Sequence, residues 1–376
     1  MKIMTILGTR PEIIRLSRVA ALLDAHADHV LVHTGQNYDA RLSQLFFDEL
    51  GMRTPDEFMG VRSPSFAGQM GQILERSYEL ILRHRPDRVL ILGDTNSGLA
   101  SIVARRLGIP VYHMEAGNRC FDDRVPEEVN RRVIDHSSSV LLPYTENSRK
   151  NLLAEGIPGS RIYVTGNPIR QVIDNFAPRI DASQVLEQLG VCRGKYFLVT
   201  AHRSENVDDE SRLTSLLAGL RALHRDYGFP VLFPLHPRTS FRANAAGMEI
   251  EGQGIRTFAP LGFFDFIRLE QNAFCILSDS GTVQEEACLF GVPNVTLRDV
   301  TERPETLECG SNVLAGVDAA AIGQAVRLVT SQIGTWRPPQ EYTQAGVAEA
   351  VCRIVLGYRV PDAAEIAWKN LPCASR

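Results

Sequence analysis

The chain has 376 residues, which exceeds what one compact core ordinarily supports, so two domains of roughly 150–200 residues are expected. Hydrophobic residues make up 44% of the sequence and charged residues 22%, and the net charge of -4 is spread over both signs. This composition argues against a basic nucleic-acid-binding surface. The sequence contains no run of 18 apolar residues, so no membrane span is expected.

The amino terminus, MKIMTILGTRP, predicts a first β-strand rather than a signal peptide. Its apolar stretch is too short for a signal-peptide core and runs straight into a turn. Seven cysteines are scattered through the chain without a CxxC pair or zinc-ligand spacing, as expected of reduced thiols. We therefore expect a cytoplasmic protein.

Short apolar runs alternate with segments of helical periodicity through the first half of the chain. A helix is expected from Pro11, and a longer one at Ala67–His84. Strands are predicted at Lys2–Leu7, His29–Thr34, Arg88–Gly93, Val111–Glu115, Ser139–Tyr144 and Arg161–Pro168. This alternation predicts a parallel sheet that helices cover on both faces.

The same rhythm restarts in the second half. Strands are predicted at Lys195–Arg203, Pro230–Pro237, Ile255–Pro260, Phe274–Gly281 and Pro293–Leu297. A final helix around Val347–Tyr358 and a tail with Trp368 are expected to return to the first domain. The sequence therefore predicts an α/β protein of two Rossmann-like, doubly wound domains that face each other across a cleft. They are residues 1–168, joined by a C-terminal helix at about 355–376, and residues 169–354.

Polar or glycine-rich clusters follow almost every predicted strand, at the edge where open parallel sheets bind ligands. They are GTRPE (Gly8–Glu12), HTGQN (His33–Asn37), GDTNS (Gly93–Ser97), HMEAGNR (His113–Arg119), TAHRSEN (Thr200–Asn206), HPR (His236–Arg238) and SDSGTVQEE (Ser278–Glu286). Each has a structural alternative: Asp94 and Ser280 are suitable helix N-caps, and His236 is a candidate loop residue held by a hydrogen bond. Seven clusters at one end of two sheets favour ligand binding.

The DSGTVQEEA segment predicts a phosphate site at a helix start. Ser280, Gly281 and Thr282 present N–H groups and hydroxyls at the positive end of the helix dipole. One turn later, Glu285 or Glu286 can accept hydrogen bonds from ribose hydroxyls. The segment therefore favours a diphosphate-linked nucleoside as ligand.

Three arginines from separate loops, Arg10, Arg203 and Arg303, are candidates to neutralise that diphosphate, with surface ion pairs as the alternative for each. No GxGxxG follows the first strand, and the chain contains neither a DxD nor an HExxH motif. We therefore expect no nicotinamide cofactor and no metal. Gly190–Lys195 is one residue too short for a P-loop.

The remaining kind of chemistry that these residues suggest is acid–base catalysis without a cofactor. Candidate groups are Asp94, Glu115, Glu127 and Glu128 in the first domain, and His202 and His236 in the second. Carboxylates gathered in a cleft raise one another's pKa, which suits proton transfer near neutral pH. For Glu127 and Glu128 the alternative is an amphipathic surface helix over Pro126–His136.

The motifs of the chain, taken together, also resemble those of a known family. The motifs GTRPEIIRLS, TGQN, ILGDTNS, HMEAGNR, PEEVNRR, VTGNP, AHRSEN, HP, SDSGTVQEEA and RDVTERPE occur in this order over nearly the whole chain. They closely resemble the non-hydrolysing UDP-N-acetylglucosamine 2-epimerase family. The resemblance implies two Rossmann-like domains of the glycosyltransferase-B type, a UDP-sugar substrate and a homodimer.

Members of that family break the bond between C1 and UDP while a base removes the C2 proton. UDP and a 2-acetamidoglucal stay bound, and UDP adds back after the proton returns to the opposite face. Matched motif by motif, the catalytic groups fall on Asp94, Glu115, Glu127 and His202. The nucleotide-binding groups fall on Ser280, Gly281, Glu286 and Arg303.

The sequence also departs from the family pattern. TGQHRE reads TGQNYD at Thr34–Asp39, which puts the second, allosteric UDP-sugar site in question, and Thr282 replaces a glycine of DSGG. EAGLRTGD becomes EAGNRCFDD, wording that resembles a branch acting on 6-deoxy UDP-sugars, the UDP-N-acetyl-L-fucosamine synthases. A UDP-dependent glycosyltransferase of the same fold is the remaining alternative, since fold alone does not separate the two.

Overall fold

The computed structural model describes residues 1–35 and 40–358, so part of the HTGQN cluster and the tail with Trp368 lie outside the described residues. The chain divides into two compact units. One comprises residues 1–173 with the return segment from residue 344, and the other comprises residues 174–343.

These divisions differ from the predicted boundaries after residues 168 and 354. The first lies within a continuous helix, α7 (Ile169–Asp181). The return segment starts earlier because α17 (Val347–Gly357) packs against α1 (Arg10–His26). Gln171 fixes the start of α17: its amide oxygen accepts from Ala348 N at 2.9 Å, and its amide nitrogen donates to Glu349 at 2.7 Å.

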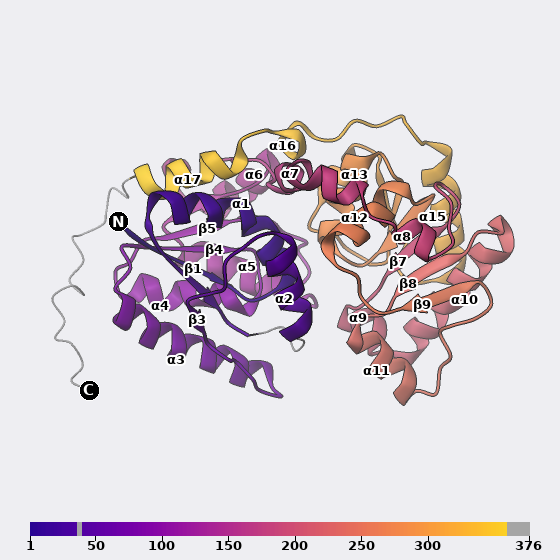
Figure 1. Cartoon of the computed structure of the whole chain (residues 1–376), viewed down its shortest axis with the longest axis horizontal. Coiled ribbons are helices and arrows are strands. Elements are labelled where there is room, and N and C mark those ends of the chain that lie inside the picture. Colours follow the sequence, from indigo (N-terminus) through magenta and orange to yellow (C-terminus); the bar gives the residue numbers. More distant parts are fainter. Residues whose placement is uncertain (36–39, 359–376) are drawn as a thin grey trace. The chain divides into compact units, whose positions relative to one another are not determined.

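The first unit contains a parallel sheet of order β3-β2-β1-β4-β5-β6. Its strands are β1 (Lys2–Leu7), β2 (Asp28–His33), β3 (Glu57–Phe58), β4 (Arg88–Leu92), β5 (Val111–Met114) and β6 (Val140–Leu142). Helices α1 and α17 lie on one face, and α3 (Phe66–His84) and α4 (Ala100–Arg106) lie on the other (Figure 1). The remaining helices are α2 (Ala40–Glu49), η1 (Asn96–Leu99), α5 (Pro126–Ser137), α6 (Glu146–Ala154) and η2 (Gly159–Arg161).

The second unit repeats this topology, with strand order β12-β11-β10-β7-β8-β9. Its strands are β7 (Phe197–Thr200), β8 (Val231–Pro234), β9 (Ile255–Phe258), β10 (Cys275–Ser278), β11 (Asn294–Thr296) and β12 (Asn312–Leu314). Its helices are α8 (Val185–Gln188), α9 (Ser204–Val207), α10 (Glu210–Tyr227), α11 (Pro237–Ala245), α12 (Phe263–Asn272), α13 (Gly281–Phe290), α14 (Pro304–Glu308), α15 (Ala319–Ser331) and α16 (Gln340–Thr343).

Alternation along the strands of the second unit builds two apolar layers. Phe197 and Val199 of β7 pack with α10 and α15, while Leu198 between them packs with α12 and α13. Both faces of the sheet are therefore buried, as in doubly wound proteins. The predicted α/β fold with two Rossmann-like sheets is confirmed.

One predicted strand is wrong. Arg161–Pro168 is not a strand of the sheet: it forms an isolated bridge between Ile162 and Leu141, and Tyr163 N and Thr165 N donate to the carbonyls of Leu141 and Pro143. The short edge strands β3 and β12 were not predicted. In the part of the chain that the structure describes, no helix is long and apolar enough to cross a membrane.

Candidate functional site

Each sheet reverses its strand order at one place, between β1 and β4 in the first unit and between β7 and β10 in the second. Ligands of open α/β sheets bind beyond the carboxyl ends of the strands at this point. The clusters Gly8–Glu12 and Gly93–Ser97 follow β1 and β4, and Thr200–Asn206 and Ser278–Glu286 follow β7 and β10. Four of the predicted clusters thus occupy the two reversal points.

Glu12 connects the two turns of the first reversal point. One of its carboxylate oxygens accepts from the backbone N–H groups of Gly8 at 2.6 Å and Thr9 at 2.7 Å, and the other accepts from the Thr95 hydroxyl at 2.6 Å. Burial raises the pKa of Glu12 to about 7, although these hydrogen bonds oppose the rise. The sequence placed Glu12 in a polar cluster without giving it a role.

Glu115 lies directly after β5 and is buried. Its backbone has a φ of 65°, a left-handed conformation that is unusual for a residue with a side chain. The carboxylate accepts from Arg15 Nη1 at 2.8 Å and from the Asn118 amide at 3.3 Å. Arg15, whose guanidinium lies 5.8 Å from the ring centre of Tyr144, holds the Glu115 carboxylate at the strand end.

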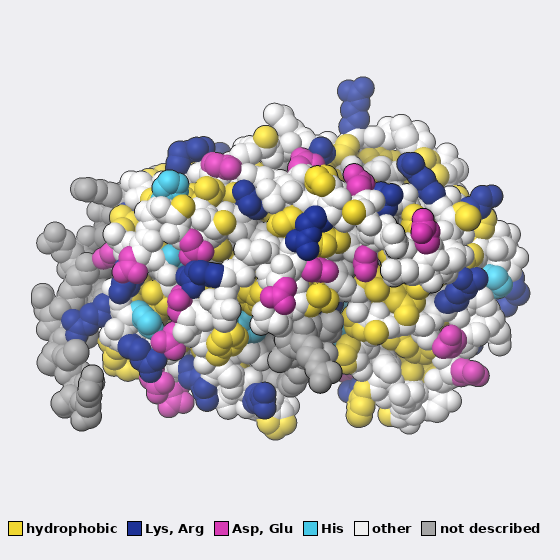
Figure 2. Space-filling model, viewed as in Figure 1, with side chains coloured by type: hydrophobic (Ala, Val, Ile, Leu, Met, Phe, Trp, Pro, Cys, Tyr) yellow, Lys and Arg dark blue, Asp and Glu magenta, His cyan; other side chains and the backbone are white. Residues whose placement is uncertain are grey.

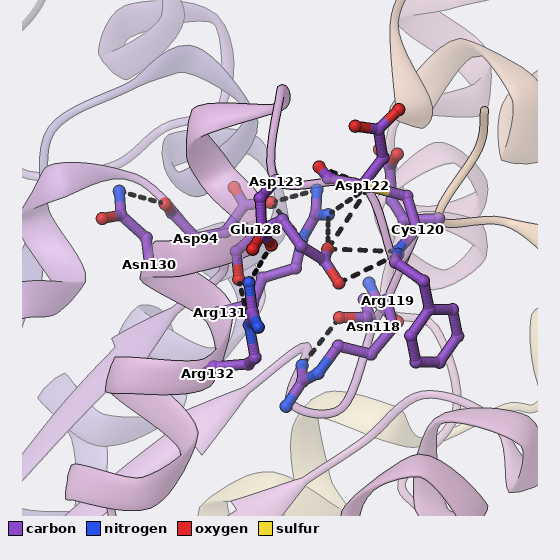
Figure 3. A network of polar contacts seen from close by, with 12 residues as sticks. Asp94, Asn118, Arg119, Cys120, Asp122, Asp123, Glu128, Asn130, Arg131 and Arg132 are labelled. Atoms are coloured by element: carbon purple, nitrogen blue, oxygen red, sulfur yellow. Dashed lines mark hydrogen bonds and ion pairs between the residues drawn. The ribbon is translucent and has the colours of Figure 1, made fainter. Parts of the chain in front are cut away.

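Asp94 directly follows the turn after β4 and contacts Arg131 of α5. Arg131 Nε lies 2.8 Å and Nη2 2.7 Å from Asp94 Oδ2, while Nη1 donates to Glu128 at 2.7 Å (Figure 3). Asn130 donates to the backbone carbonyl of Asp94 at 3.0 Å. The capping alternative for Asp94 is wrong, because Thr95 is the N-cap of η1.

Glu128 supports the loop after β5 rather than acting as a high-pKa acid. It accepts from the backbone N–H groups of Cys120 and Phe121, both at 3.0 Å. Burial alone would raise its pKa, but these bonds and Arg131 hold the pKa of Glu128 below its ordinary value. The expectation that the clustered carboxylates raise one another's pKa is therefore wrong for Glu128.

Helix α5 turns its charged side toward the interior. Glu128, Arg131 and Asp135 are buried, whereas Val129 and Val133 are exposed. Three of the four buried side chains of this helix are charged and the fourth is Ile134, so the alternative of an amphipathic surface helix fails for Glu128. Glu127, at the start of the helix, is half-buried.

A buried His113–Asp135 pair links the backbones near Asp94 and Glu115. His113 Nε2 donates to the carbonyl of Gly93 at 2.8 Å, and Nδ1 lies 2.8 Å from Asp135. Asp135 also accepts from Gly117 N at 3.1 Å and pairs with Arg119 at 2.8 Å. The segments that carry both candidate carboxylates are therefore tied to one network.

In the second unit Asp279 organises the turn that follows β7. Its carboxylate accepts from the backbone N–H groups of His202 at 2.8 Å and Arg203 at 2.9 Å, and it lies 3.1 Å from His202 Nδ1. Burial would raise the pKa of Asp279, but His202 and the Arg203 N–H hold it far below its ordinary value. The sequence did not assign this role to Asp279.

His202 and His236 lie next to each other, with ring centres 5.2 Å apart. His236 is the N-cap of α11, and its ring accepts a hydrogen bond from Arg238 N at 3.2 Å. The alternative given for His236, a loop residue held by a hydrogen bond, therefore fits the structure. His202 is partly exposed at 37%, which leaves its ring accessible.

The start of α13 has the features expected of a phosphate site. Ser280 is the N-cap residue, yet its hydroxyl makes no capping bond and instead contacts the Thr282 hydroxyl at 3.1 Å. Gly281 is packed tightly, since a Cβ there would lie 2.5 Å from Glu302 Oε1. The first N–H groups of the helix are therefore not capped by the Ser280 side chain.

None of the three candidate arginines forms a simple surface pair. Arg303 is 4% exposed and pairs with buried Glu285. Arg203 donates to the backbone carbonyl of Asp279 at 3.0 Å, and Arg10 lies over the ring of Phe46 at 5.9 Å. Burial lowers the pKa of Arg10.

Glu286 is 5% exposed and has a second carboxyl group as its neighbour, Glu270 of α12, which is fully buried. No local sequence pattern points to Glu270, because the two residues become neighbours only when α12 packs against α13.

The wider surroundings are of mixed charge. A pocket of about 370 Å³ beside the Asp94 network is lined by Arg119, Phe121, Asp122, Asp123, Glu128, Arg132 and Glu155. On the face that Figure 2 shows, acidic and basic side chains are interspersed rather than gathered by sign. Within residues 1–35 and 40–358, no three His, Cys, Asp or Glu side chains gather as metal ligands would.

Comparison of the chain with known proteins shows the family to which it belongs. The sequence profile described as UDP-N-acetylglucosamine 2-epimerase matches residues 21–356. The UDP-N-acetylglucosamine 2-epimerase of Methanocaldococcus jannaschii is 38% identical over 366 residues, which cover 94% of this chain and 99% of that protein. This chain belongs to the UDP-N-acetylglucosamine 2-epimerase family.

Solved structures of family members share the whole fold. The structure of the enzyme from Rickettsia bellii has a TM-score of 0.89 at 42% identity and covers 95% of this chain and 96% of that chain. The M. jannaschii enzyme in complex with UDP-GlcNAc and UDP has a TM-score of 0.90 at 38% identity, over 94% and 99% of the two chains. WaaG, a glycosyltransferase at 14% identity with a TM-score of 0.57, shares the fold alone.

These relatives confirm the predicted family and its fold type. None of the names reported above refers to a 6-deoxy sugar, so the fucosamine-synthase alternative gains no support, and the glycosyltransferase alternative is not favoured. The roles of individual site residues stay predictions.

Proposed function

We propose that this chain is a non-hydrolysing UDP-N-acetylglucosamine 2-epimerase, which inverts C2 of a UDP-2-acetamido sugar by elimination and re-addition of UDP. The observation that carries the proposal is the pair of carboxylates at neighbouring strand ends, Asp94 after β4 and Glu115 after β5. Each is held in place by an arginine, Arg131 and Arg15 respectively.

In this proposal the sugar ring meets the first unit. Inverting C2 without a redox step requires a base on one face of the ring and an acid on the other, and one carboxyl group on each face suffices. Asp94, Glu115 and Glu127 are the candidates. The backbone of Glu115 is strained, and its carboxylate accepts hydrogen bonds from Arg15 and Asn118. This arrangement is typical of a group that is positioned for chemistry.

The second unit would hold UDP. The N–H groups at the start of α13, with Ser280, Gly281 and Thr282, suit the diphosphate, and Glu286 suits the ribose. Breaking the C1–O bond leaves its electron pair, and so one further negative charge, on a diphosphate that is already negatively charged. Stabilising the leaving diphosphate is therefore the larger electrostatic task. The proposed cationic or hydrogen-bonding partners of the diphosphate are Arg203, Arg303 and His236, with Arg10 as a further candidate from the first unit. His202 is the proposed catalytic histidine.

NMR of the sugar protons after incubation with UDP-N-acetylglucosamine tests the proposal. We expect a second UDP-sugar with the H2 coupling of the manno configuration and no free N-acetylmannosamine. Free sugar as the main product would indicate a hydrolase, and an unchanged substrate would contradict the proposed substrate. Measuring kcat/KM also for UDP-2-acetamido-2,6-dideoxy-L-talose tests the 6-deoxy alternative.

A homodimer and a cytoplasmic location complete the proposal. They rest on the family resemblance, and light scattering of the purified protein would test the first.

A further inference from the structure

One buried carboxylate of the second unit lies among three guanidinium groups. Glu302, which is 4% exposed, accepts a hydrogen bond through Oε2 from Arg298 Nη1 at 2.7 Å. Its other oxygen, Oε1, lies 3.8 Å from Arg203 Nη2 and 4.0 Å from Arg303 Nη1. Of these three distances, only the first is that of a hydrogen bond. Arg298 therefore holds the carboxylate, while the two arginines assigned to the diphosphate lie slightly farther from it.

Arg298 is fixed to the framework of the sheet. It is 1% exposed and lies two residues beyond the end of β11. Asn206 donates to the carbonyl of Leu297 at 2.7 Å, and Gly316 N donates to the carbonyl of Arg298 at 3.2 Å. Among the described residues, Nε and Nη2 of Arg298 are buried without a hydrogen-bond partner. The Arg298 side chain therefore forms its hydrogen bond with Glu302.

The Glu302 carboxylate lies against the start of α13. A Cβ on Gly281 would lie 2.5 Å from Glu302 Oε1 and 3.7 Å from Arg303 Cζ. Arg203 is also tied to this end of the sheet, because its Nε donates to the carbonyl of Asp279 at 3.0 Å. Glu302 thus borders the predicted phosphate site. A carboxylate in this place competes with a diphosphate for the same guanidinium groups.

Other carboxylates also contact the two arginines. Arg303 pairs with buried Glu285, and Arg203 Nη1 lies 4.0 Å from Glu205. Glu302 lies within 4.0 Å of both arginines, so a shift of its carboxylate affects both at once.

We propose that Arg298 is a positioning residue for diphosphate binding: it binds the Glu302 carboxylate and so keeps that carboxylate from drawing the two neighbouring arginines away from the leaving group. The inference rests on the proposed function, in which Arg203 and Arg303 contact the diphosphate. Without Arg298, Glu302 is a buried carboxylate that needs another cation, and the two guanidinium groups beside it supply one. Each must then leave Glu302 before it can bind a phosphate oxygen.

Calorimetric titration with UDP of Arg298→Met, Glu302→Gln and the double variant tests the inference. Arg298→Met should bind UDP about tenfold more weakly than the wild type, because the carboxylate then binds the two arginines. Glu302→Gln removes the competing charge and should bind UDP at least as tightly as the wild type, to within about threefold. The double variant should have the affinity of Glu302→Gln, because Arg298 acts through Glu302.

UMP and a matched control separate positioning from general damage to the site. The loss in Arg298→Met should be smaller for UMP, which lacks the second phosphate. Arg212 controls for the lost positive charge, since it pairs with Asp299 at 3.5 Å and donates to Asn206 at 3.2 Å. Arg212→Met removes a cation from the same unit but no partner of Glu302, and it should bind UDP within about threefold of the wild type.

Three results would overturn the inference. They are wild-type UDP affinity in Arg298→Met, equal losses for UDP and UMP, and a double variant that binds UDP as weakly as Arg298→Met. If Arg298→Met does not fold, the double variant and Glu302→Gln still decide, because unequal UDP affinities of these two proteins would show that Arg298 acts by another route.

An Arg203→Met variant separates this inference from the proposed function. If Arg203→Met weakens UDP binding while Arg298→Met does not, only the role of Arg298 fails. Unchanged affinity in both Arg203→Met and Arg303→Met would remove the diphosphate placement itself, and the inference with it.

Discussion

Asp94 and Glu115 are held by guanidinium groups that come from helices distant in sequence. Arg131 reaches Asp94 from α5, and Arg15 reaches Glu115 from α1. Arg131 contacts Asp94 Oδ2 through two nitrogens and Arg15 contacts Glu115 through Nη1, and such charge-assisted contacts orient a carboxylate as well as lower its energy. Proton transfer depends on such positioning, because the reacting atoms must lie within hydrogen-bond distance.

The carboxylates themselves give the first prediction. Asp94→Asn, Glu115→Gln and Glu127→Gln should each lower kcat by at least about 100-fold, because each removes a group proposed to move a proton. UDP affinity should stay close to that of the wild type, since UDP is assigned to other residues. Steady-state kinetics and calorimetry check both points. Near-normal rates in two of the three variants would refute the assignment.

Arg131 should also matter for stability. Arg131→Met leaves Glu128, which is 1% exposed, without its buried cation, and we expect a loss of about 3 kcal/mol in the free energy of unfolding. The adjacent Arg132 is a matched control, because its side chain is 43% exposed and pairs with exposed Asp123. Arg132→Met should cost less than about 1 kcal/mol. Urea titrations in which the two variants lose equal stability would contradict the role of Arg131.

At the scale of elements, the turn from β1 into α1 is the tightest part of the first reversal point. A Cβ on Gly8 would lie 2.0 Å from Thr34 Oγ1 and 2.5 Å from Ser97 Oγ. Gly8→Ala should therefore lower the free energy of unfolding by about 2 kcal/mol or more. Gly71→Ala within α3 meets nothing within 4 Å and should raise it by about 0.5–1 kcal/mol. Similar stabilities of the two variants would show that the turn adapts.

The start of α1 should also make stability depend on pH. The pKa of Glu12 is raised to about 7, so between pH 4.5 and pH 7 the folded chain holds a proton that the unfolded chain has released. Its contribution to stability is present at low pH and is lost as the pH rises through 7. Relative to Glu12→Gln, which cannot ionise, the wild type should lose on the order of 2 kcal/mol between pH 5 and pH 8. A constant difference in the free energy of unfolding between the two proteins would contradict the pKa of Glu12.

The sequence predicted the central strands and one edge strand of each sheet, β6 and β9, but missed the opposite edge strands, β3 and β12. Central strands such as β4 and β10 are continuous apolar runs, because both of their faces are buried. The missed edge strands β3 and β12 span two and three residues. Arg161–Pro168 has a strand-like composition, but whether it pairs with β6 depends on tertiary geometry that no local pattern contains.

The site shows the same division. Candidate groups such as Glu115 and Ser280 were predictable because each follows a strand at the ligand edge. Their supporting partners were not: Arg15 lies 100 residues from Glu115, and Asp279 lies 77 residues from His202. Glu270 reads as one more polar residue of an amphipathic helix until α12 packs against α13.

For the whole molecule, the proposed reaction needs no metal and no nicotinamide. EDTA-treated protein freed of small molecules should keep its epimerase activity, because the proposed bond cleavage relies on acid–base groups and on arginine and helix-terminus contacts to the diphosphate. The control is the same protein with Mg²⁺ added. Activity that returned only with the divalent ion would contradict this prediction.

The central claim is that C2 is inverted through loss and return of its proton. Incubating the enzyme with UDP-N-acetylglucosamine in D₂O and observing C2 by NMR tests it most directly. The account predicts that the H2 signal disappears from both epimers as they interconvert, because the proton delivered to C2 comes from solvent through an enzyme group. Epimers that interconvert while keeping protium at C2 would contradict it.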